Sequence, residues 1–335
     1  MRVVAALDKF RGTATAAEAA AAVGHAGWEL GHDVDEVPMS DGGEGLLAVL
    51  GGPNRTSIVT GPLGAPVTAP WRIAHRTAVV EMALASGLAL AGGPEGNDPL
   101  GASTIGTGEL IDRALAEGAR RVIVGLGGSA TTDGGLGAVE ALRASPARFR
   151  SVELEVACDV RTRFVDAAAV FAPQKGASPA QVGMLTARLE QLARRYRDEF
   201  GVDVTALDGG GAAGGLAGAL AALGGRIVPG FELVAEHVDL EQRIAEADVV
   251  VTGEGYLDPQ SLDGKVVGGV CEVAAAAGKP VIVIAGDADP DVAAEVARAG
   301  PNVVSLVARY GEERPFREPR WCIEAAANEA LRSLA

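Results

Sequence analysis

The sequence contains few aromatic residues, cysteines and histidines. Phe, Trp and Tyr together make up 4% of its 335 residues, and it has 3 cysteines and 4 histidines. The cysteines, at positions 158, 271 and 322, are odd in number, far apart and without metal-ligand spacing. This pattern argues against a disulfide framework and a zinc site, and it favours a reducing cytoplasm as the location. The scattered histidines indicate neither a Ser-His-Asp triad nor a metal pair.

Positive charge and long hydrophobic runs are also scarce. The chain has 29 basic and 44 acidic side chains, so its formal net charge is −15. An acidic surface repels nucleic acids and anionic lipids, and we expect neither a nucleic acid nor a membrane as a partner. The longest uncharged stretch, 209–225, has eight glycines among 17 residues, too short and flexible for a bilayer helix. Asp8 and Lys9 interrupt the N-terminal apolar run before it reaches signal-peptide length.

Aliphatic residues and glycine, in contrast, are abundant. The chain is 48% hydrophobic and has 46 glycines, about twice the average share of roughly 7%. Short β-branched runs alternate with alanine-rich stretches, a rhythm typical of a parallel sheet covered by helices on both faces. We therefore predict an α/β fold, with strands at residues 3–4, 34–37, 77–82, 122–124, 152–156, 249–251, 281–284 and 303–304.

The composition shifts near residue 60 and recovers near residue 240. Several prolines interrupt an extended run at 62–73, which favours edge strands or turns over a central parallel strand. An insertion between two halves of a discontinuous domain explains both shifts. We expect residues 1–60 plus 240–335 to form one domain and residues 61–239 to form an inserted second α/β domain.

The segment 122–137 has the pattern of a strand, a glycine loop and a helix. The N–H groups of such a loop and of a helix N-terminus attract anions, and the missing Cβ atoms let a phosphate come close. The alternative is a tight turn in which glycines serve only the backbone. A similar segment at 209–216 suggests two glycine loops around one cleft. The candidate phosphate contacts are Gly127, Gly128, Ser129, Thr131, Asp133 and Gly134.

Two known nucleotide motifs fit poorly. Residues 125–130 satisfy G-x-G-x-x-A after a strand, but the acid expected about twenty residues on is missing near Ser145. A Walker A loop is absent, because Val266 follows Gly264-Lys265 where the metal-binding Ser or Thr should stand. A kinase would therefore need another nucleotide site.

Carboxylates follow two of the predicted strands at the edge where open α/β sheets bind ligands. Asp41 and Glu44 lie in a glycine turn after 34–37, and Glu254 follows 249–251 with Lys265 soon after. Such groups suit Mg²⁺ and phosphate, although Asp41 and Glu44 also have the form of a helix capping box and the other turn could be a solvated loop.

Asp159 and Lys175 are further candidates. Asp159 ends the run 152–156, where a partly desolvated carboxylate can accept a hydroxyl proton or can only cap the next segment of the chain. Lys175 stands beside a turn, as a point charge for a phosphate or carboxylate or as an ordinary solvated lysine.

Taken in order, these motifs resemble those of the class I glycerate kinases, the bacterial glycerate 2-kinase family. The set is collinear from the first strand to about residue 270. Its members are residues 8–13, 40–45, 97–99, 103–110, 125–135, 157–160, 171–176, 209–215, 252–258 and 264–265.

The resemblance implies a transferase that uses ATP and Mg²⁺ to phosphorylate D-glycerate to 2-phosphoglycerate. It implies a cleft between a Rossmann- or flavodoxin-like domain and a second domain likened to restriction-enzyme folds, with a homodimer left open. The implied catalytic residues are Asp159, Lys9 and Lys265. The implied glycerate contacts are Asp8, Arg11, Ser103, Thr104 and Lys175, the nucleotide contacts are the six loop residues named above, and the metal ligands are Asp41, Glu44 and Glu254.

Two alternatives to this function stay open. One is a kinase for another small hydroxy acid on the same scaffold. The other is a sensor of nucleotides or sugar acids that has lost turnover. Retention of every acidic motif argues against the sensor, because sensing needs few carboxylates.

Overall fold

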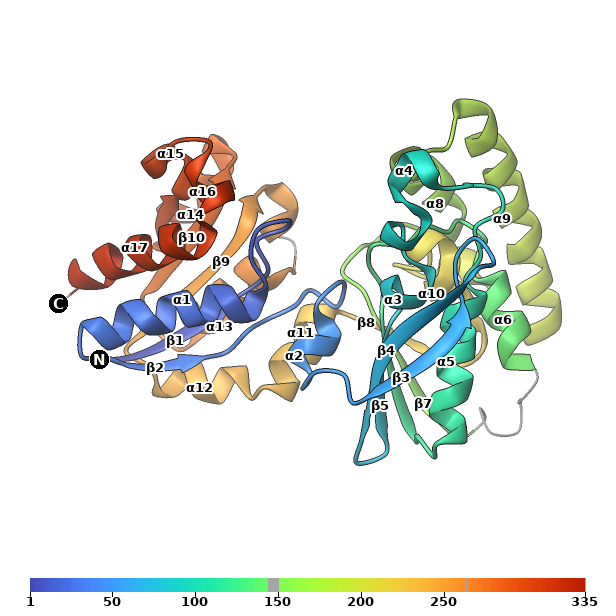
Figure 1. Cartoon of the computed structure of the whole chain (residues 1–335), viewed down its shortest axis with the longest axis horizontal. Coiled ribbons are helices and arrows are strands. Elements are labelled where there is room, and N and C mark those ends of the chain that lie inside the picture. Colours follow the sequence, from blue (N-terminus) through green and yellow to red (C-terminus); the bar gives the residue numbers. More distant parts are fainter. Residues whose placement is uncertain (144–150, 263, 335) are drawn as a thin grey trace. The chain divides into compact units, whose positions relative to one another are not determined.

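The chain forms two compact α/β units (Figure 1). The computed structural model describes residues 1–335 except 144–150, 263 and 335, so the position near Ser145 lies outside the described residues. Residues 1–41 and 230–335 form what we call the split unit, and residues 42–229 form the inserted unit. An insertion was expected, but its first boundary lies earlier than residue 60, because Arg55–Thr60 pairs with Pro66–Ala74 in the sheet of the inserted unit.

The split unit is built on a parallel five-stranded sheet. Its strand order is β2-β1-β9-β10-β11, and every neighbouring pair is parallel. Numbered within the unit, this is the 2-1-3-4-5 order of flavodoxin-like folds, whose ligands bind at the switch point beside the first strand. The strands are β1 (Arg2–Leu7), β2 (Asp33–Glu36), β9 (Val249–Leu257), β10 (Val281–Ala288) and β11 (Asn302–Ser305).

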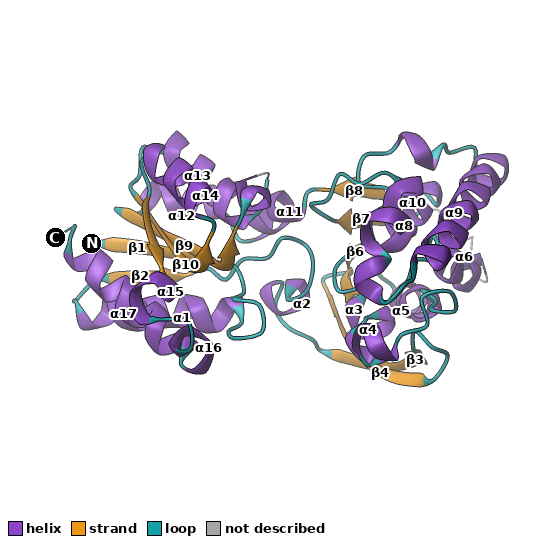
Figure 2. Cartoon of the chain, turned by 90° about the horizontal axis from the view of Figure 1, so that it is seen from above, coloured by secondary structure: helices purple, strands orange, loops and turns teal. Residues whose placement is uncertain are grey.

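Helices cover both faces of this sheet, as Figure 2 shows. One face packs Val3, Ala5 and Leu7 against α1 and α17. Helix α1 begins at a capping box in which Thr15 and Glu18 exchange hydrogen bonds. The helices are α1 (Ala16–Glu29), α11 (Gly230–His237), α12 (Leu240–Glu246), α13 (Val266–Ala276), α14 (Pro290–Arg298), α15 (Leu306–Tyr310), α16 (Arg314–Arg317) and α17 (Pro319–Arg332), with the 3₁₀ helix η5 (Pro259–Leu262).

The inserted unit contains a mixed six-stranded sheet in the order β3-β4-β5-β6-β7-β8. The first two pairs are antiparallel and the other three are parallel. Pro66 and Pro70 lie in the part of β4 that pairs only with the edge strand β3, as the proline content predicts. The strands are β3 (Arg55–Thr60), β4 (Pro66–Ala74), β5 (Thr77–Glu81), β6 (Arg121–Gly125), β7 (Glu153–Ala157) and β8 (Arg226–Val228).

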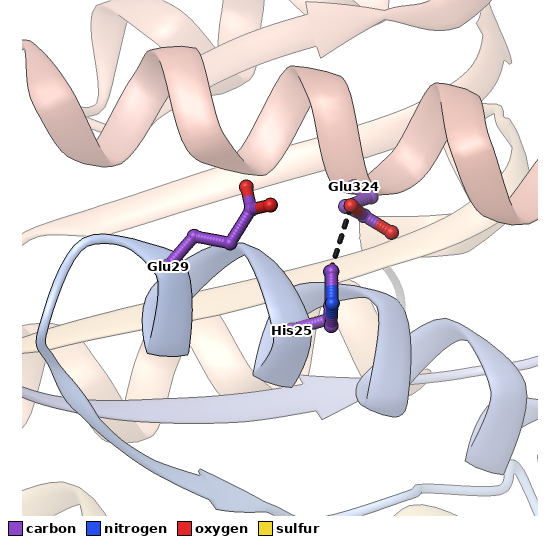
Figure 3. Close-up of side chains that lie close together, drawn as sticks. All are labelled: His25, Glu29 and Glu324. Atoms are coloured by element: carbon purple, nitrogen blue, oxygen red, sulfur yellow. Dashed lines mark hydrogen bonds and ion pairs between the residues drawn. The ribbon is translucent and has the colours of Figure 1, made fainter.

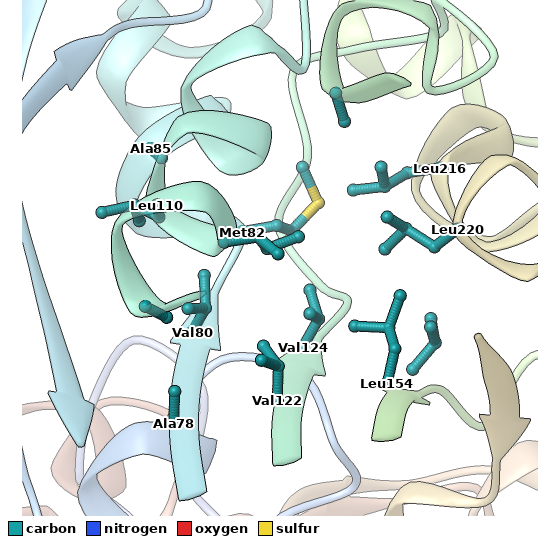
Figure 4. Packing of buried hydrophobic residues seen from close by; sticks show 14 of the residues in the cluster. Ala78, Val80, Met82, Ala85, Leu110, Val122, Val124, Leu154, Leu216 and Leu220 are labelled. Atoms are coloured by element: carbon teal, nitrogen blue, oxygen red, sulfur yellow. The ribbon is translucent and has the colours of Figure 1, made fainter. Parts of the chain in front are cut away.

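Helices α5 and α10 bury the core of this sheet. Figure 4 shows Val80, Val122 and Val124 on the strands facing Leu110 of α5 and Leu216 of α10. The long helix α9 packs against α8 and α10 as a further layer. The helices are α2 (Leu46–Val49), α3 (Ala83–Ser86), α4 (Gly93–Gly96), α5 (Ile105–Ala116), α6 (Leu136–Arg143), α8 (Ala167–Phe171), α9 (Pro179–Phe200) and α10 (Ala212–Ala222), with the 3₁₀ helices η1 (Ala89–Ala91), η2 (Phe164–Asp166), η3 (Pro173–Lys175) and η4 (Val204–Ala206).

The eight predicted strands are confirmed, since each overlaps an observed strand, and the α/β fold is confirmed with them. Within the described ranges, no helix is both long enough and apolar enough to cross a membrane.

Candidate active site

Three carboxylates and a lysine meet at the switch point of the split unit. Asp8 and Lys9 directly follow β1, Asp41 follows β2 and Glu254 lies in the neighbouring strand β9. The Nζ atom of Lys9 lies 3.6 Å from Oδ1 of Asp8 and 3.4 Å from Oδ1 of Asp41. The parallel register brings β1 and β9 side by side up to Leu7 and Gly253, so their carboxyl ends place these groups together. We call Asp8, Lys9, Asp41 and Glu254 the acidic cluster.

The acidic cluster carries negative charge that the folded chain does not fully compensate. Burial, aided by the nearby Asp8 carboxylate, raises the pKa of Glu254 to about 7 against the lowering effects of the Ser261 hydroxyl and the Lys265 charge. Burial raises the pKa of Asp8 to about 6, against the opposing charge of Lys9. The buried Oε1 atom of Glu254 has no hydrogen-bond partner among the described residues, although the Ser261 hydroxyl lowers the pKa of this carboxyl group. A cation bound here would supply the missing partner.

Glycine allows the loop after β1 to lie close to β9. A Cβ atom on Gly255 would lie 2.9 Å from the amide nitrogen of Arg11 and 3.2 Å from Cα of Phe10. Arg11 itself is exposed. Lys265 is the N-cap of α13, with Nζ 3.4 Å from Oε1 of Gln260, and its charge acts on Glu254. The split unit therefore holds Lys9, Arg11 and Lys265 as cations around its carboxylates.

Glu44 is exposed and belongs to the inserted unit, whereas Asp41 ends the first segment of the split unit, so the metal-ligand role of Glu44 stays a prediction. The capping-box alternative is wrong, because the N-cap of α2 is Gly45, which has no side chain of its own to cap the helix. The amides of Gly45 and Leu47 donate instead to Oε1 of Glu81, at 3.1 and 2.6 Å.

The inserted unit brings two of the predicted glycine segments together. A Cβ atom on Gly127 would lie 2.9 Å from Cα of Gly43, and one on Gly125 would lie 2.8 Å from the carbonyl oxygen of Gly42. This contact lies at the carboxyl ends of β5 and β6, where Glu81 accepts hydrogen bonds from the amides at the start of α2. Gly127 is half-buried and Gly128 is exposed, so their backbone is the accessible part of the loop.

The rest of this loop is occupied by the protein itself. Asp133 accepts hydrogen bonds from the amides of Gly135 (3.0 Å) and Gly137 (3.2 Å) and from the hydroxyl of Thr104 (2.8 Å). Its carboxylate therefore takes the anion position at the start of α6 that was expected to hold a phosphate. Gly134, expected as another contact, is buried and donates its amide to the carbonyl of Gly214 at 3.0 Å.

The two glycine-rich segments pack on each other. A Cβ atom on Gly214 would lie 2.1 Å from the carbonyl oxygen of Thr131, and Ala213, Gly214 and Gly215 all have positive φ. Thr131 is completely buried by this contact. The expected pair of glycine loops thus exists as a packing contact, which explains why both segments are rich in glycine.

Lys175 lies beneath the loop rather than in solvent. Its side chain is 3% exposed, and Nζ donates to Oγ of Ser129 at 2.7 Å and to the carbonyl oxygen of Thr131 at 2.6 Å. Asn97 donates to the carbonyl oxygens of Ala130 (3.0 Å) and Lys175 (2.9 Å). The solvated alternative is therefore wrong, and Lys175 supports the loop from inside.

The remaining predicted residues of the inserted unit lie near this loop. Asp159 is half-buried after β7, and a Cβ atom on Gly209 would approach the carbonyl oxygen of Val160 to 2.9 Å. Ser103 accepts from the amide of Ile105 at 3.2 Å at the start of α5, and Thr104 is fully buried against Asp133. Ser103 and Thr104 thus have structural partners of their own.

A separate group of possible metal ligands lies on the helices of the split unit. His25 and Glu29 of α1 face Glu324 of α17, and Nδ1 of His25 lies 2.8 Å from Oε1 of Glu324 (Figure 3). Within the part of the chain that is described, this is the one set of three such donors with mutual distances below 4.8 Å. His25 and Glu29 are exposed, and Glu29 accepts from Asn328, so the set is a surface ion-pair network.

Sequence and structure comparisons agree on one family. The model of the glycerate kinase family matches residues 3–147 and 143–335. The chain is 40% identical to glycerate 2-kinase of Escherichia coli K12 over 331 residues, covering 87% of each chain. It is 38% identical to glycerate kinase of Bacillus subtilis 168, covering 87% of this chain and 86% of that one.

A solved structure shows the same fold over the full length. A crystal structure from Salmonella typhimurium LT2 assigned as glycerate kinase 2 superposes with a TM-score of 0.81 at 34% identity, covering 100% of this chain and 98% of that one. The parallel sheet with acidic groups at its switch point agrees with this likeness. The chain therefore belongs to the glycerate kinase family.

Proposed function

We propose that this protein transfers the γ-phosphoryl group of ATP to the 2-hydroxyl group of D-glycerate with the help of Mg²⁺. The observation that carries the proposal is the acidic cluster at the switch point of the split unit, in a chain of the glycerate kinase family. Phosphoryl transfer depends on alignment and charge neutralisation more than on covalent chemistry. The cluster offers carboxylates for a metal and cations for phosphate oxygens.

The carboxylates of Asp41 and Glu254, with Asp8 beside them, would hold a magnesium ion partly through water, because in the described part of the chain they do not form a set of three ligands within 4.8 Å of one another. Mg²⁺ in kinases is held by one or two carboxylates together with water and substrate phosphates. The buried Oε1 atom of Glu254, which has no hydrogen-bond partner among the described residues, and the pKa values of Asp8 and Glu254, raised mainly by burial, support a cation at this place. When bound, Mg²⁺ neutralises charge on the phosphates of ATP.

The cations of the split unit would bind anionic oxygens. Lys9 is held between Asp8 and Asp41, so its Nζ atom lies at a fixed position in the cluster. Lys265 at the start of α13 can meet a phosphate oxygen, and the exposed Arg11 can meet the carboxylate of glycerate with its planar fork.

The inserted unit would supply an anion contact and a base. The accessible backbone of Gly127 and Gly128, next to Ser129, can donate to an anionic group. Asp159, at the end of β7, would accept the proton of the 2-hydroxyl group as that oxygen attacks phosphorus. Asp133, Gly134, Thr131 and Thr104 hold this loop in shape and are not proposed as ligand contacts.

A substrate panel with product identification tests the proposal. ADP release is measured with MgATP and D-glycerate, L-glycerate, lactate or tartrate, and the product is identified by ³¹P and ¹H NMR. We expect turnover with D-glycerate and a phosphate on carbon 2. Turnover with a different acid alone would favour a kinase for that acid, and nucleotide binding without turnover would favour a sensor.

All three cysteines are thiols in the structure, which agrees with the reducing cytoplasm that we propose as the location.

A further inference from the structure

Lys175 is the one buried lysine of the four in the chain, and among the described residues no carboxylate accepts a hydrogen bond from it. The others, Lys9, Lys265 and Lys279, are all partly exposed. The ammonium group has three N–H bonds, and its two acceptors are the neutral oxygens of Ser129 and Thr131. A buried charge without a counterion is costly and tends to be neutralised.

The groups around Lys175 are mostly neutral. The loop contributes Ser129, Thr131 and the carboxylate of Asp133, and Asp133 is the charge that acts on Lys175. The segment before α5 contributes the amide of Asn97. From α9, Tyr196 donates to the carbonyl of Gly134 and burial raises its pKa, so it stays neutral.

Asp133 compensates Lys175 only in part. Its carboxylate already accepts from Gly135, Gly137 and Thr104, which use its hydrogen-bonding capacity. Burial lowers the pKa of Lys175 to about 7 in spite of Asp133. Near neutral pH the free protein therefore contains Lys175 in both its charged and its neutral form.

Two buried side-chain oxygens next to Lys175 have no hydrogen-bond partner among the described residues. They are Oγ1 of Thr131 and Oδ1 of Asn97. Ser129 follows the exposed Gly128 in the chain and accepts a hydrogen bond from Lys175, so an anion held by the backbone of Gly127 and Gly128 would lie close to the residue that contacts the ammonium group.

We propose that Lys175 is a positioning residue that takes up a proton from solvent when an anionic ligand binds to the Gly127–Ser129 backbone. This inference rests on the proposed function for the identity of its ligand. The charged form of Lys175 draws the Ser129 hydroxyl and the Thr131 carbonyl inward, which shapes the backbone above, and it attracts the anion through Ser129. The anion in turn stabilises the charged form, because opposite charges in a poorly solvated site attract strongly.

The consequence is a pH-dependent affinity of defined sign. Below pH 7 Lys175 is already charged in the free protein, so the anion binds without proton uptake. Above pH 7 each pH unit adds the cost of protonating Lys175, so affinity falls about tenfold per unit. Glycerate and Mg-bound ADP are fully ionised between pH 7.5 and 9, so the ligands contribute no titration of their own.

Calorimetry on the full chain tests this proposal. Binding of MgADP and, separately, of D-glycerate is measured at pH 7.5, 8.25 and 9 in buffers of different ionisation enthalpy, which gives the number of protons taken up. We expect one of the two ligands to bind with an uptake of between about half and one proton, and this ligand is the one seated on the loop. No uptake with either ligand would overturn the proposal.

Variants assign the proton to its residue. Lys175→Met keeps the length of the side chain without its charge, and we expect it to abolish proton uptake and flatten the pH dependence. Lys279→Met removes a lysine between α13 and β10 and should retain both. Proton uptake that persists in Lys175→Met would overturn the proposal. If Lys175→Met fails to fold, Ser129→Ala should reduce affinity and weaken the pH slope with Lys175 intact, and an unchanged slope would then count against the proposal.

The outcome is separable from that of the proposed function. A protein that binds MgADP with Lys175-dependent proton uptake but does not phosphorylate glycerate supports the inference and contradicts the function. A protein that phosphorylates glycerate but shows no proton uptake supports the function and contradicts the inference.

Discussion

The two units place polar groups at the carboxyl ends of their strands in different ways. In the split unit, Asp8, Asp41 and Glu254 gather charge that Lys9 compensates only in part, and an oxygen of Glu254 is left without a partner among the described residues. In the inserted unit, the carboxylates of Asp133 and Glu81 accept hydrogen bonds from backbone amides of the same unit. An acidic residue after a strand can therefore serve a ligand or the fold, and its hydrogen-bond partners tell which.

Asp159 is the residue of the inserted unit that we propose as the general base. We expect Asp159→Asn to lower kcat for D-glycerate by about 10²- to 10⁴-fold, the usual effect of losing a general base, with little change in KM. Steady-state ADP release measures this.

The control for Asp159 is Asp166→Asn, an exposed aspartate of the same unit, which should keep full activity. Equal activity of Asp159→Asn and Asp166→Asn would remove the base from the inserted unit.

Gly214 tests whether the inserted unit depends on close backbone packing. Its φ is +67°, and an added Cβ atom would lie 2.1 Å from the carbonyl oxygen of Thr131. We expect Gly214→Ala to lower the free energy of unfolding by about 3 kcal/mol, through strain and the forced shift of the loop. Chemical denaturation measures this loss.

Gly118→Ala is the matched control. Gly118 also has a positive φ (+91°), but no atom lies within 4 Å of the added Cβ position. The substitution should cost about 1 kcal/mol from backbone strain alone. Similar losses for both variants would show that the contact between the glycine segments is unimportant.

Glu254 tests the uncompensated charge of the split unit. Burial raises its pKa from an ordinary value of 4.5 to about 7, so its stabilising contribution is complete below pH 4.5 and is lost as the pH rises through 7. Glu254→Gln stays neutral and avoids this loss. Without divalent ions at pH 8, its free energy of unfolding should exceed that of the wild type by about 2 kcal/mol, and by much less at pH 4.5.

Added Mg²⁺ should reduce this difference, because the ion stabilises the charged carboxylate of the wild type. Denaturation at both pH values, with and without Mg²⁺, makes the comparison. A variant less stable than the wild type at pH 8 in the absence of metal would contradict the account of this charge.

Glu44 should show the smallest effect. It is exposed, so Glu44→Gln should change the Mg²⁺ concentration for half-maximal activity by less than about twofold, since isolated surface charges contribute little. A tenfold increase would return Glu44 to the metal ligands.

The sequence predicts the strands, the α/β fold and the acidic residues of the split unit well, because these depend on local patterns. Asp8, Asp41 and Glu254 could be found from their place after β-branched runs. The partners of Lys175 and Glu81 could not, because Ser129 lies 46 residues before Lys175 and Gly45 lies 36 residues before Glu81. No local pattern says which of two distant segments will bury a lysine or receive a cap.

The capping role of Asp133 also could not be predicted from the sequence. The glycine loop has the composition of a phosphate site, but its own aspartate occupies the helix N-terminus, with Thr104 as a partner 29 residues earlier. The sequence indicates that an anion belongs at this position. It does not indicate that the anion is already part of the chain.

The claim on which the account depends most is that the acidic cluster holds the divalent ion. Binding of Mn²⁺ to the full chain, followed by electron paramagnetic resonance of the free ion, tests it directly. We predict one site in the wild type whose affinity falls by about tenfold or more in Glu254→Gln and is unchanged in Glu44→Gln. Equal Mn²⁺ binding by the wild type and Glu254→Gln would contradict the account.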